Sequence, residues 1–98
     1  MKIIPEPLVF EWDEGNQGKS WQKHQVGISE AEEIFFDEHK KLYPDPIHSG
    51  KEKRKIMIGK TKKDRVLFIV FTIRKQKVRI ISARDLNKRE EGLYEKTT

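Results

Sequence analysis

The sequence predicts an α+β fold, a small antiparallel β-sheet with helices packed on one face. Two strand-like segments, 66–73 and 78–84, are separated by only a short charged turn, which is the pattern of neighbouring antiparallel strands. Helical patterns precede and follow these strands. With 98 residues, the chain forms a single domain, 1–98, with one modest core.

The segment 66–73 is the predicted centre of the sheet. All of its residues except Thr72 are apolar, and most are β-branched or aromatic, which predicts a strand buried on both faces. After a turn around 75–77, the alternation in 78–84 places side chains on two faces. Val78, Ile80 and Ser82 are expected on one face, and Arg79, Ile81 and Ala83 on the other. One face must therefore accommodate Arg79.

The N-terminal part predicts a strand followed by a helix. Residues 8–12 are a short strand-like segment after two prolines. Asp13 can cap a helix that reaches about His24. Gly15 and Gly18 disfavour this helix, so it depends on packing against the rest of the protein.

A second, better-marked helix is expected from Ser29. The segment Ser29 to Glu32 has capping-box spacing, and an apolar stripe follows at helical intervals. The prolines in 43–46 end this region, and 47–53 is expected to be an exposed connection.

The remaining elements are a strand over 54–61 and a terminal helix over 86–95. In the strand, Arg54, Ile56 and Ile58 share one face. Gly59 is expected to form a bulge or a turn entry. Asp85 or Asn87 can cap the terminal helix. The expected order of elements is β, α, α, β, β, β, α.

Charge divides the chain into two halves. Residues 1–40 carry four lysines and nine acids, a net charge of −5, whereas residues 41–98 have a net charge of +10. A segregated basic surface favours nucleic acid or an acidic protein as the partner. A solvated face that only keeps the protein soluble accounts for the charge equally well.

Several classes of protein and site are excluded or disfavoured. The chain has no cysteine, no secretion signal and no run of about 18 apolar residues, so we expect a soluble, cytoplasmic protein without membrane contact. Gly59-Lys60-Thr61 resembles a phosphate-binding loop, but position 54 is arginine where that loop needs glycine. The three histidines lack metal-ligand spacing, and we expect no metal ion or cofactor.

Three arginines on or beside the predicted strands are the best candidates for a functional site. Arg54, Arg79 and Arg84 are positioned by a sheet, and a planar guanidinium binds phosphate in two-point geometry. Alternatively, they pair with acids such as Glu11, Glu52 or Glu90. His24 beside Lys23 is a candidate acid or base, because a neighbouring cation lowers the pKa of an imidazole.

The chain resembles the BrnT toxins of bacterial type II toxin–antitoxin systems over roughly residues 8 to 95. The most specific matching segment is Val78-Arg-Ile-Ile-Ser-Ala-Arg84, followed by Lys88-Arg-Glu90 and Tyr94. Further matches are Phe10-Glu-Trp-Asp13, Lys19, Lys23-His24, Val26, Glu30-Ala-Glu-Glu-Ile-Phe35, Asp37, Glu52-x-Arg54, Ile58-Gly-Lys-Thr61 and Leu67 to Thr72. Gln25 departs from the family pattern, where many members have glycine, and this weakens a role for His24.

The resemblance implies a RelE-like fold and a ribonuclease that stops translation. A BrnA-type antitoxin would bind and silence the toxin, and the complex would repress its own operon, so that operator DNA is contacted only through the complex. RNA cleavage without a metal ion requires a base, an acid and positive charge on the phosphate.

On this resemblance, the expected catalytic residues are Arg79, Arg54, Glu52 and His24. Arg79 and Arg54 would stabilise the phosphate and the transition state, and Glu52 or His24 would move the proton. Arg84, Lys19 and Lys23 would bind RNA. Two other functions remain open: a non-catalytic module that binds nucleic acid or an acidic protein, and a degenerate toxin that acts only in the regulatory complex.

Overall fold

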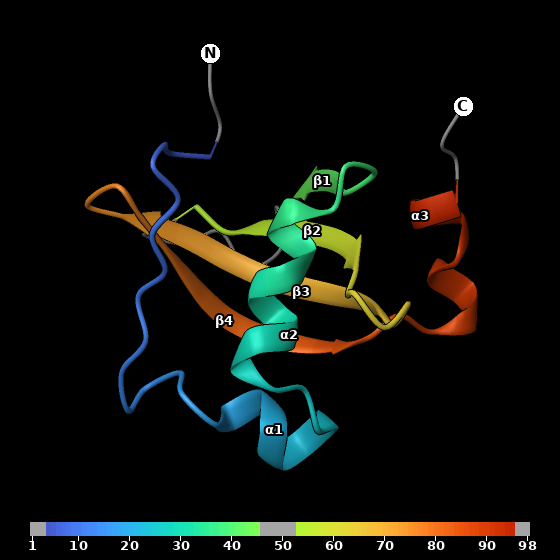
Figure 1. Cartoon of the computed structure of the whole chain (residues 1–98), viewed down its shortest axis with the longest axis horizontal. Coiled ribbons are helices and arrows are strands. Elements are labelled where there is room, and N and C mark those ends of the chain that lie inside the picture. Colours follow the sequence, from blue (N-terminus) through green and yellow to red (C-terminus); the bar gives the residue numbers. More distant parts are fainter. Residues whose placement is uncertain (1–3, 46–52, 96–98) are drawn as a thin grey trace.

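A four-stranded antiparallel sheet, crossed on one face by the helical segment 28–36, forms the body of the protein (Figure 1). The computed structural model describes residues 4–45 and 53–95. The sheet has the order β1-β2-β3-β4, so every strand pairs with its neighbour in the sequence. The elements are α1 (Lys19–His24), α2 (Ile28–Glu33), the 3₁₀ turn η1 (Ile34–Phe36), β1 (Lys41–Pro44), β2 (Lys55–Lys60), β3 (Val66–Arg74), β4 (Lys77–Asp85), the 3₁₀ turn η2 (Lys88–Glu90) and α3 (Gly92–Glu95). The predicted fold class is confirmed.

The core lies between the sheet and the layer of α2 and η1. On β3, Leu67, Ile69 and Phe71 are fully buried and belong to the same apolar cluster as Ile34 and Phe35. The Phe35 ring meets the Phe71 ring edge-on, with the centroids 5.2 Å apart. The side chains that alternate with these on β3 are only half-buried; they are Val66, Phe68 and Val70. The prediction that β3 is central is confirmed, but the prediction that both faces are buried is wrong.

A bulge in β4 changes which of its side chains are buried. Phe71 pairs with Ile80, but the preceding residue Val70 pairs with Ser82, so Ile81 is an extra residue. After the bulge, Ala83 continues the buried face begun by Val78 and Ile80. Strict alternation predicted that Ser82, and not Ala83, would lie on the same face as Val78 and Ile80. That prediction was therefore wrong beyond Ile80.

The segment before α1 differs most from the prediction. Instead of a strand over 8–12, there is a single parallel bridge between Phe10 and Val78 at the free edge of β4. The helix expected from Asp13 begins only at Lys19, because residues 14–18 form turns and Gly18 has a φ of +81°. Asp13 therefore does not cap a helix.

Four local predictions about element boundaries and a bulge are corrected. α2 begins at Ile28 and not at Ser29, and the Glu30 carboxylate accepts a hydrogen bond from the Gly27 N–H. β1 occupies 41–44, where the prolines predicted a break, and β2 begins at Lys55. Gly59 is in regular register opposite Leu67, with no bulge at that position. The expected connection 47–53 falls almost wholly outside the described residues.

The chain ends in two short turns of helix that are tied to the sheet. Asn87, one of the two residues predicted to cap a terminal helix, caps η2. The single helix predicted over 86–95 is divided into η2 and the separate short helix α3. The Tyr94 hydroxyl donates to Asp37 at 2.6 Å, and the Tyr43 hydroxyl donates to the Leu93 carbonyl at 2.6 Å. In the described parts of the chain, no helix has the length and apolar character needed to cross a membrane.

Candidate functional site

One row of side chains crosses the sheet on the face opposite α2. Thr72 of β3 pairs with Arg79 of β4. On the other side of β3, Lys55 pairs with Phe71, and continuing this register places Arg54 beside Thr72. The Thr72 hydroxyl donates to the Lys53 carbonyl at 2.8 Å, which holds the start of β2 in place. Arg54 and Arg79 therefore lie on the same face, separated by one strand.

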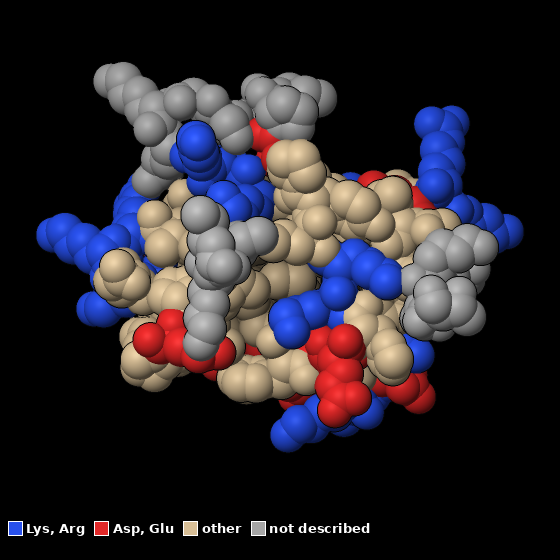
Figure 2. Space-filling view, turned by 90° about the horizontal axis from the view of Figure 1, so that it is seen from above, with Lys and Arg blue, Asp and Glu red and all other residues tan. Residues whose placement is uncertain are grey.

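These two arginines line a shallow cavity of about 180 Å³. Its other lining residues include two further cations, Lys19 at the start of α1 and Arg74 at the end of β3. The lining is completed by Gly15, Asn16 and Ile81. We call this the basic pocket. Figure 2 shows Lys and Arg side chains gathered at the left end of the molecule, the end where Figure 1 places the β3–β4 turn.

Arg79 is held by two carboxylates from the segment beside β4. Its Nη1 and Nη2 atoms each donate to one Asp13 carboxylate oxygen at 2.9 Å. Nη1 also lies 3.5 Å from Glu11 Oε1. The Arg79 side chain is only 12% exposed, whereas that of Asp13 is 56% exposed. The hydrogen bonds with Asp13 raise the pKa of Arg79 and lower the pKa of Asp13, so both groups are charged at neutral pH.

Asn16 fixes the segment that carries these carboxylates. It is 5% exposed, and its side-chain amide donates to the Ile80 carbonyl at 2.9 Å and to the Glu11 carbonyl at 3.1 Å. Its side-chain oxygen accepts from the Asp13 N–H at 2.8 Å. The backbone of Asp13 is therefore tied to β4 one residue beyond Arg79.

Two of the other predicted site residues, Lys23 and His24, lie outside the basic pocket. Lys23 is exposed on α1, and His24 is the last residue of that helix, where its carbonyl accepts from Arg65. Glu52 lies outside the described residues. Of the predicted residues, the structure therefore brings together Arg54, Arg79 and Lys19.

Arg84 forms a separate cluster near the other end of β4. Its guanidinium lies 4.1 Å from the centre of the Phe68 ring and pairs at two points with Glu90, at 2.8 and 2.7 Å. Four residues of β4 lie between it and Arg79, so the two are about 16 Å apart along the strand. Two of the predicted arginines thus pair with acids, as the alternative interpretation expected. Arg84 pairs with Glu90, and Arg79 pairs with Asp13 and Glu11.

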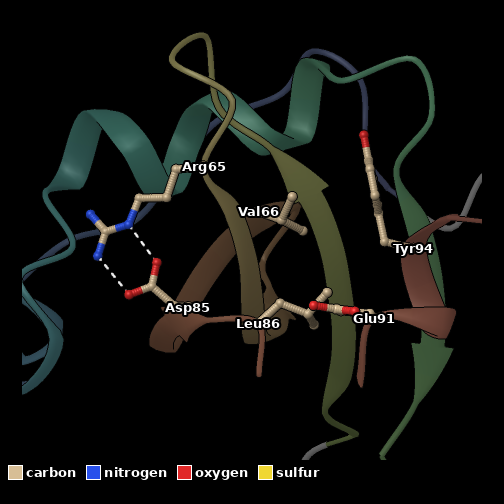
Figure 3. Close-up of a pocket in the computed structure, with 6 residues that line it drawn as sticks. All are labelled: Arg65, Val66, Asp85, Leu86, Glu91 and Tyr94. Atoms are coloured by element: carbon tan, nitrogen blue, oxygen red, sulfur yellow. Dashed lines mark hydrogen bonds and ion pairs between the residues drawn. The ribbon is translucent and has the colours of Figure 1, made fainter. Parts of the chain in front are cut away.

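A second cavity, of about 400 Å³, lies next to Arg65 (Figure 3). It is lined by Arg65, Val66, Asp85, Leu86, Glu91 and Tyr94. All five N–H donors of Arg65 are used, by Asp85, Glu30 and the carbonyls of His24 and Gln25. Arg65 therefore ties the end of α1 and the start of α2 to the sheet, and it has no donor left for a phosphate.

Sequence reasoning missed three residues of the basic pocket and its surroundings. Arg74 lies two residues after Thr72, a spacing that places both side chains on the same face of a strand. The sequence alone could therefore have indicated Arg74. Asn16 and Asp13 carried no such signal, because their partners on β4 are 64 and 66 residues away.

Comparison with known proteins supports the resemblance. A family model described as the ribonuclease toxin, BrnT, of a type II toxin–antitoxin system matches residues 12–90. No curated protein matches the chain. The matched region includes nearly every element described above and all of the basic pocket.

Proposed function

Since the chain belongs to the BrnT family of type II toxin–antitoxin ribonuclease toxins, we propose that it cleaves RNA at the basic pocket and thereby inhibits translation. The observation that carries this proposal is the convergence of Lys19, Arg54, Arg74 and Arg79 on one small cavity. Four cations in one cavity suit a phosphate group. Arg74 and Arg79 lie on strands, Arg54 directly precedes β2, and Lys19 begins α1, so regular structure limits the movement of all four.

The proposed reaction is attack by a ribose 2′-hydroxyl on the adjacent phosphorus. A new P–O2′ bond forms, the bond to the 5′ oxygen of the next nucleotide breaks, and that oxygen takes up a proton. Arg54 and Arg79 stabilise the negative charge that develops on the phosphate oxygens. Such cations neutralise the phosphate without a metal ion, and they repel a divalent cation from the pocket.

We propose that Glu52 or His24 carries out the proton transfers. Glu52 precedes Arg54 by two residues and remains the proposed base. His24 is the alternative, and its position at the far end of α1 from Lys19 argues for Glu52 first. Lys23 and Arg84 are proposed to contact the RNA backbone beyond the cleaved phosphate.

An antitoxin is the partner that membership of a type II family implies. We propose that it is of the BrnA type, that it silences the ribonuclease in the cytoplasm, and that the complex contacts operator DNA through the antitoxin.

The test is induced expression in a bacterial host, with growth and total RNA followed over time. The chain is compared with an Arg54→Ala/Arg79→Ala variant and with a Lys63→Ala/Arg89→Ala variant as control. The control loses the same charge at two exposed positions outside the basic pocket. We expect growth arrest and RNA decay for the wild type and the control only. The folded state of each variant is checked by thermal unfolding.

Two results would contradict the proposal. Normal growth and intact RNA with folded wild-type protein would favour a non-catalytic binding module or a degenerate toxin. Full toxicity of the folded Arg54/Arg79 variant would place the reaction elsewhere on the protein.

A further inference from the structure

Asp13 binds the two terminal nitrogens of Arg79, the atoms through which a guanidinium would bind a phosphate. The two Asp13 oxygens and the two terminal nitrogens of Arg79 form a parallel pair of 2.9 Å hydrogen bonds. A guanidinium binds a phosphate through the same two-point geometry. The Asp13 side chain is 56% exposed and that of Arg79 only 12%, so the carboxylate stands on the solvent side of the ion pair.

The position of this carboxylate is built into the turn that carries it. Asp13 Oδ1 accepts a second hydrogen bond from the Gly15 N–H at 2.8 Å. The Asp13 carbonyl accepts from the N–H groups of Asn16 at 3.1 Å and Gln17 at 2.7 Å. Gly15 lies close to the same guanidinium, since a Cβ at this position would be 3.0 Å from Arg79 Nη2. The turn is therefore shaped to place a carboxylate on Arg79.

We propose that Asp13 is an internal competitor for phosphate, which holds Arg79 in place in the free protein and leaves its guanidinium when an RNA phosphate binds. This inference rests on the proposed function. Asp13 then sets the affinity of the basic pocket for RNA and keeps Arg79 from binding phosphate groups that contact no other part of the pocket. An RNA phosphate replaces Asp13 because the remaining cations, Lys19, Arg54 and Arg74, attract it at the same time.

The experiment measures binding of a short single-stranded RNA whose sugars carry 2′-O-methyl groups, so that the 2′ oxygen cannot attack. Asp13→Asn keeps the size and an acceptor for the Gly15 N–H but removes the charge. We expect this variant to bind about fivefold more tightly, the effect of one unit charge at about 4 Å in water. Asp13→Ser is a second uncharged variant, and we expect a gain in the same direction.

Glu14→Gln is the matched control. Glu14 is the next residue, it is exposed, and its replacement changes the net charge by the same amount. We expect less than a twofold change for it, since Glu14 does not line the basic pocket. A gain in affinity separates competition from a structural role, because damage to the turn would weaken binding.

The outcomes are distinct for this inference and for the proposed function. Equal or weaker binding by both Asp13 variants relative to Glu14→Gln would overturn the competitor role, as would the absence of RNA binding by every variant. If the Asp13 variants bind more tightly but no protein cuts unmodified RNA, the inference holds and the proposed ribonuclease activity fails.

Discussion

Gly59 of β2 and Ile34 of η1 are packed so closely that no methyl group fits between them. A Cβ on Gly59 would lie 2.9 Å from the Ile34 Cβ and 2.9 Å from the Ile34 carbonyl oxygen. Gly59 is buried near the end of the paired strand β2, and Ile34 is 0% exposed. This contact sets how near the helical layer can approach the sheet.

Replacing Gly59 with alanine should therefore destabilise the protein. The added methyl group must push η1 away from β2, at a cost of about 1–3 kcal/mol in the free energy of unfolding. Urea unfolding of both proteins measures the difference. Gly92→Ala is the control, because a Cβ there has no neighbour within 4 Å. Equal stability of Gly59→Ala and the wild type would contradict the packing argument.

The Tyr94–Asp37 hydrogen bond should make stability fall at alkaline pH. Burial and the hydrogen bond to Asp37 raise the pKa of Tyr94 from 10.0 to about 12. A raised folded-state pKa gives stability that is complete below the unfolded pKa of 10.0 and is lost as pH rises toward about 12. Urea unfolding at about pH 8 and about pH 11 should show this loss for the wild type.

Tyr94→Phe tests the assignment to this hydroxyl. The variant should lose about 1 kcal/mol at neutral pH and should depend less on alkaline pH. Tyr43→Phe removes the other tyrosine hydroxyl, which donates to the Leu93 carbonyl, and should keep the alkaline loss of the wild type. The same alkaline loss in Tyr94→Phe as in the wild type would assign it to other groups.

The Arg84–Glu90 pair should contribute to acid sensitivity. Hydrogen bonds from Arg84 lower the pKa of Glu90 below its ordinary value of 4.5. A lowered folded-state pKa gives stability that is present above pH 4.5 and is lost as pH falls through the folded value. Glu90→Gln should cost about 1 kcal/mol at neutral pH and flatten the acid side of a stability curve. Glu91→Gln, at the exposed next position, should leave the curve unchanged, and an equal effect of both variants would contradict the pair's role.

Arg74, the fourth cation of the basic pocket, should contribute to RNA binding. Arg74→Ala should weaken binding of the 2′-O-methyl RNA several-fold and reduce the salt slope by about 0.7, the value for one phosphate contact on a single strand. The measurement is a binding titration at several salt concentrations. Arg89→Ala, an exposed position outside the basic pocket, should leave both quantities nearly unchanged. An unchanged slope for Arg74→Ala would remove this residue from the phosphate contacts.

Much of the sheet could be predicted because its signals are local. The apolar run of β3, the charged turn after it and the alternation in β2 all identify their elements without knowledge of distant residues. The turn itself uses Lys75 and Gln76 at φ values of 50° and 68°, as a two-residue hairpin requires. The same local alternation assigned Arg54 and Arg79 each to a face of its own strand, and the pairing of the strands then brings both onto one face of the sheet.

The errors arise where distant contacts decide the local structure. β1 forms in spite of its proline because β2 offers it a pairing edge from Lys55 to Ile58. The bulge at Ile81 is evident only from how β4 pairs with β3, and no glycine marks it in the sequence. Asp13 reads as a helix cap in sequence, but Gly18 adopts a φ of +81° and Arg79 takes the carboxylate. The register across the sheet, not the local sequence, decides these features.

The basic pocket joins residues that lie far apart in the sequence. Gly15, Asn16 and Lys19 come from the segment before and at the start of α1, whereas Arg79 and Ile81 belong to β4, the fourth strand of the sheet. Without β4 a nascent chain has neither the bridge between Phe10 and Val78 nor the partner of Asp13. Any chain that ends before β4 therefore lacks Arg79 and Ile81 and cannot complete the basic pocket.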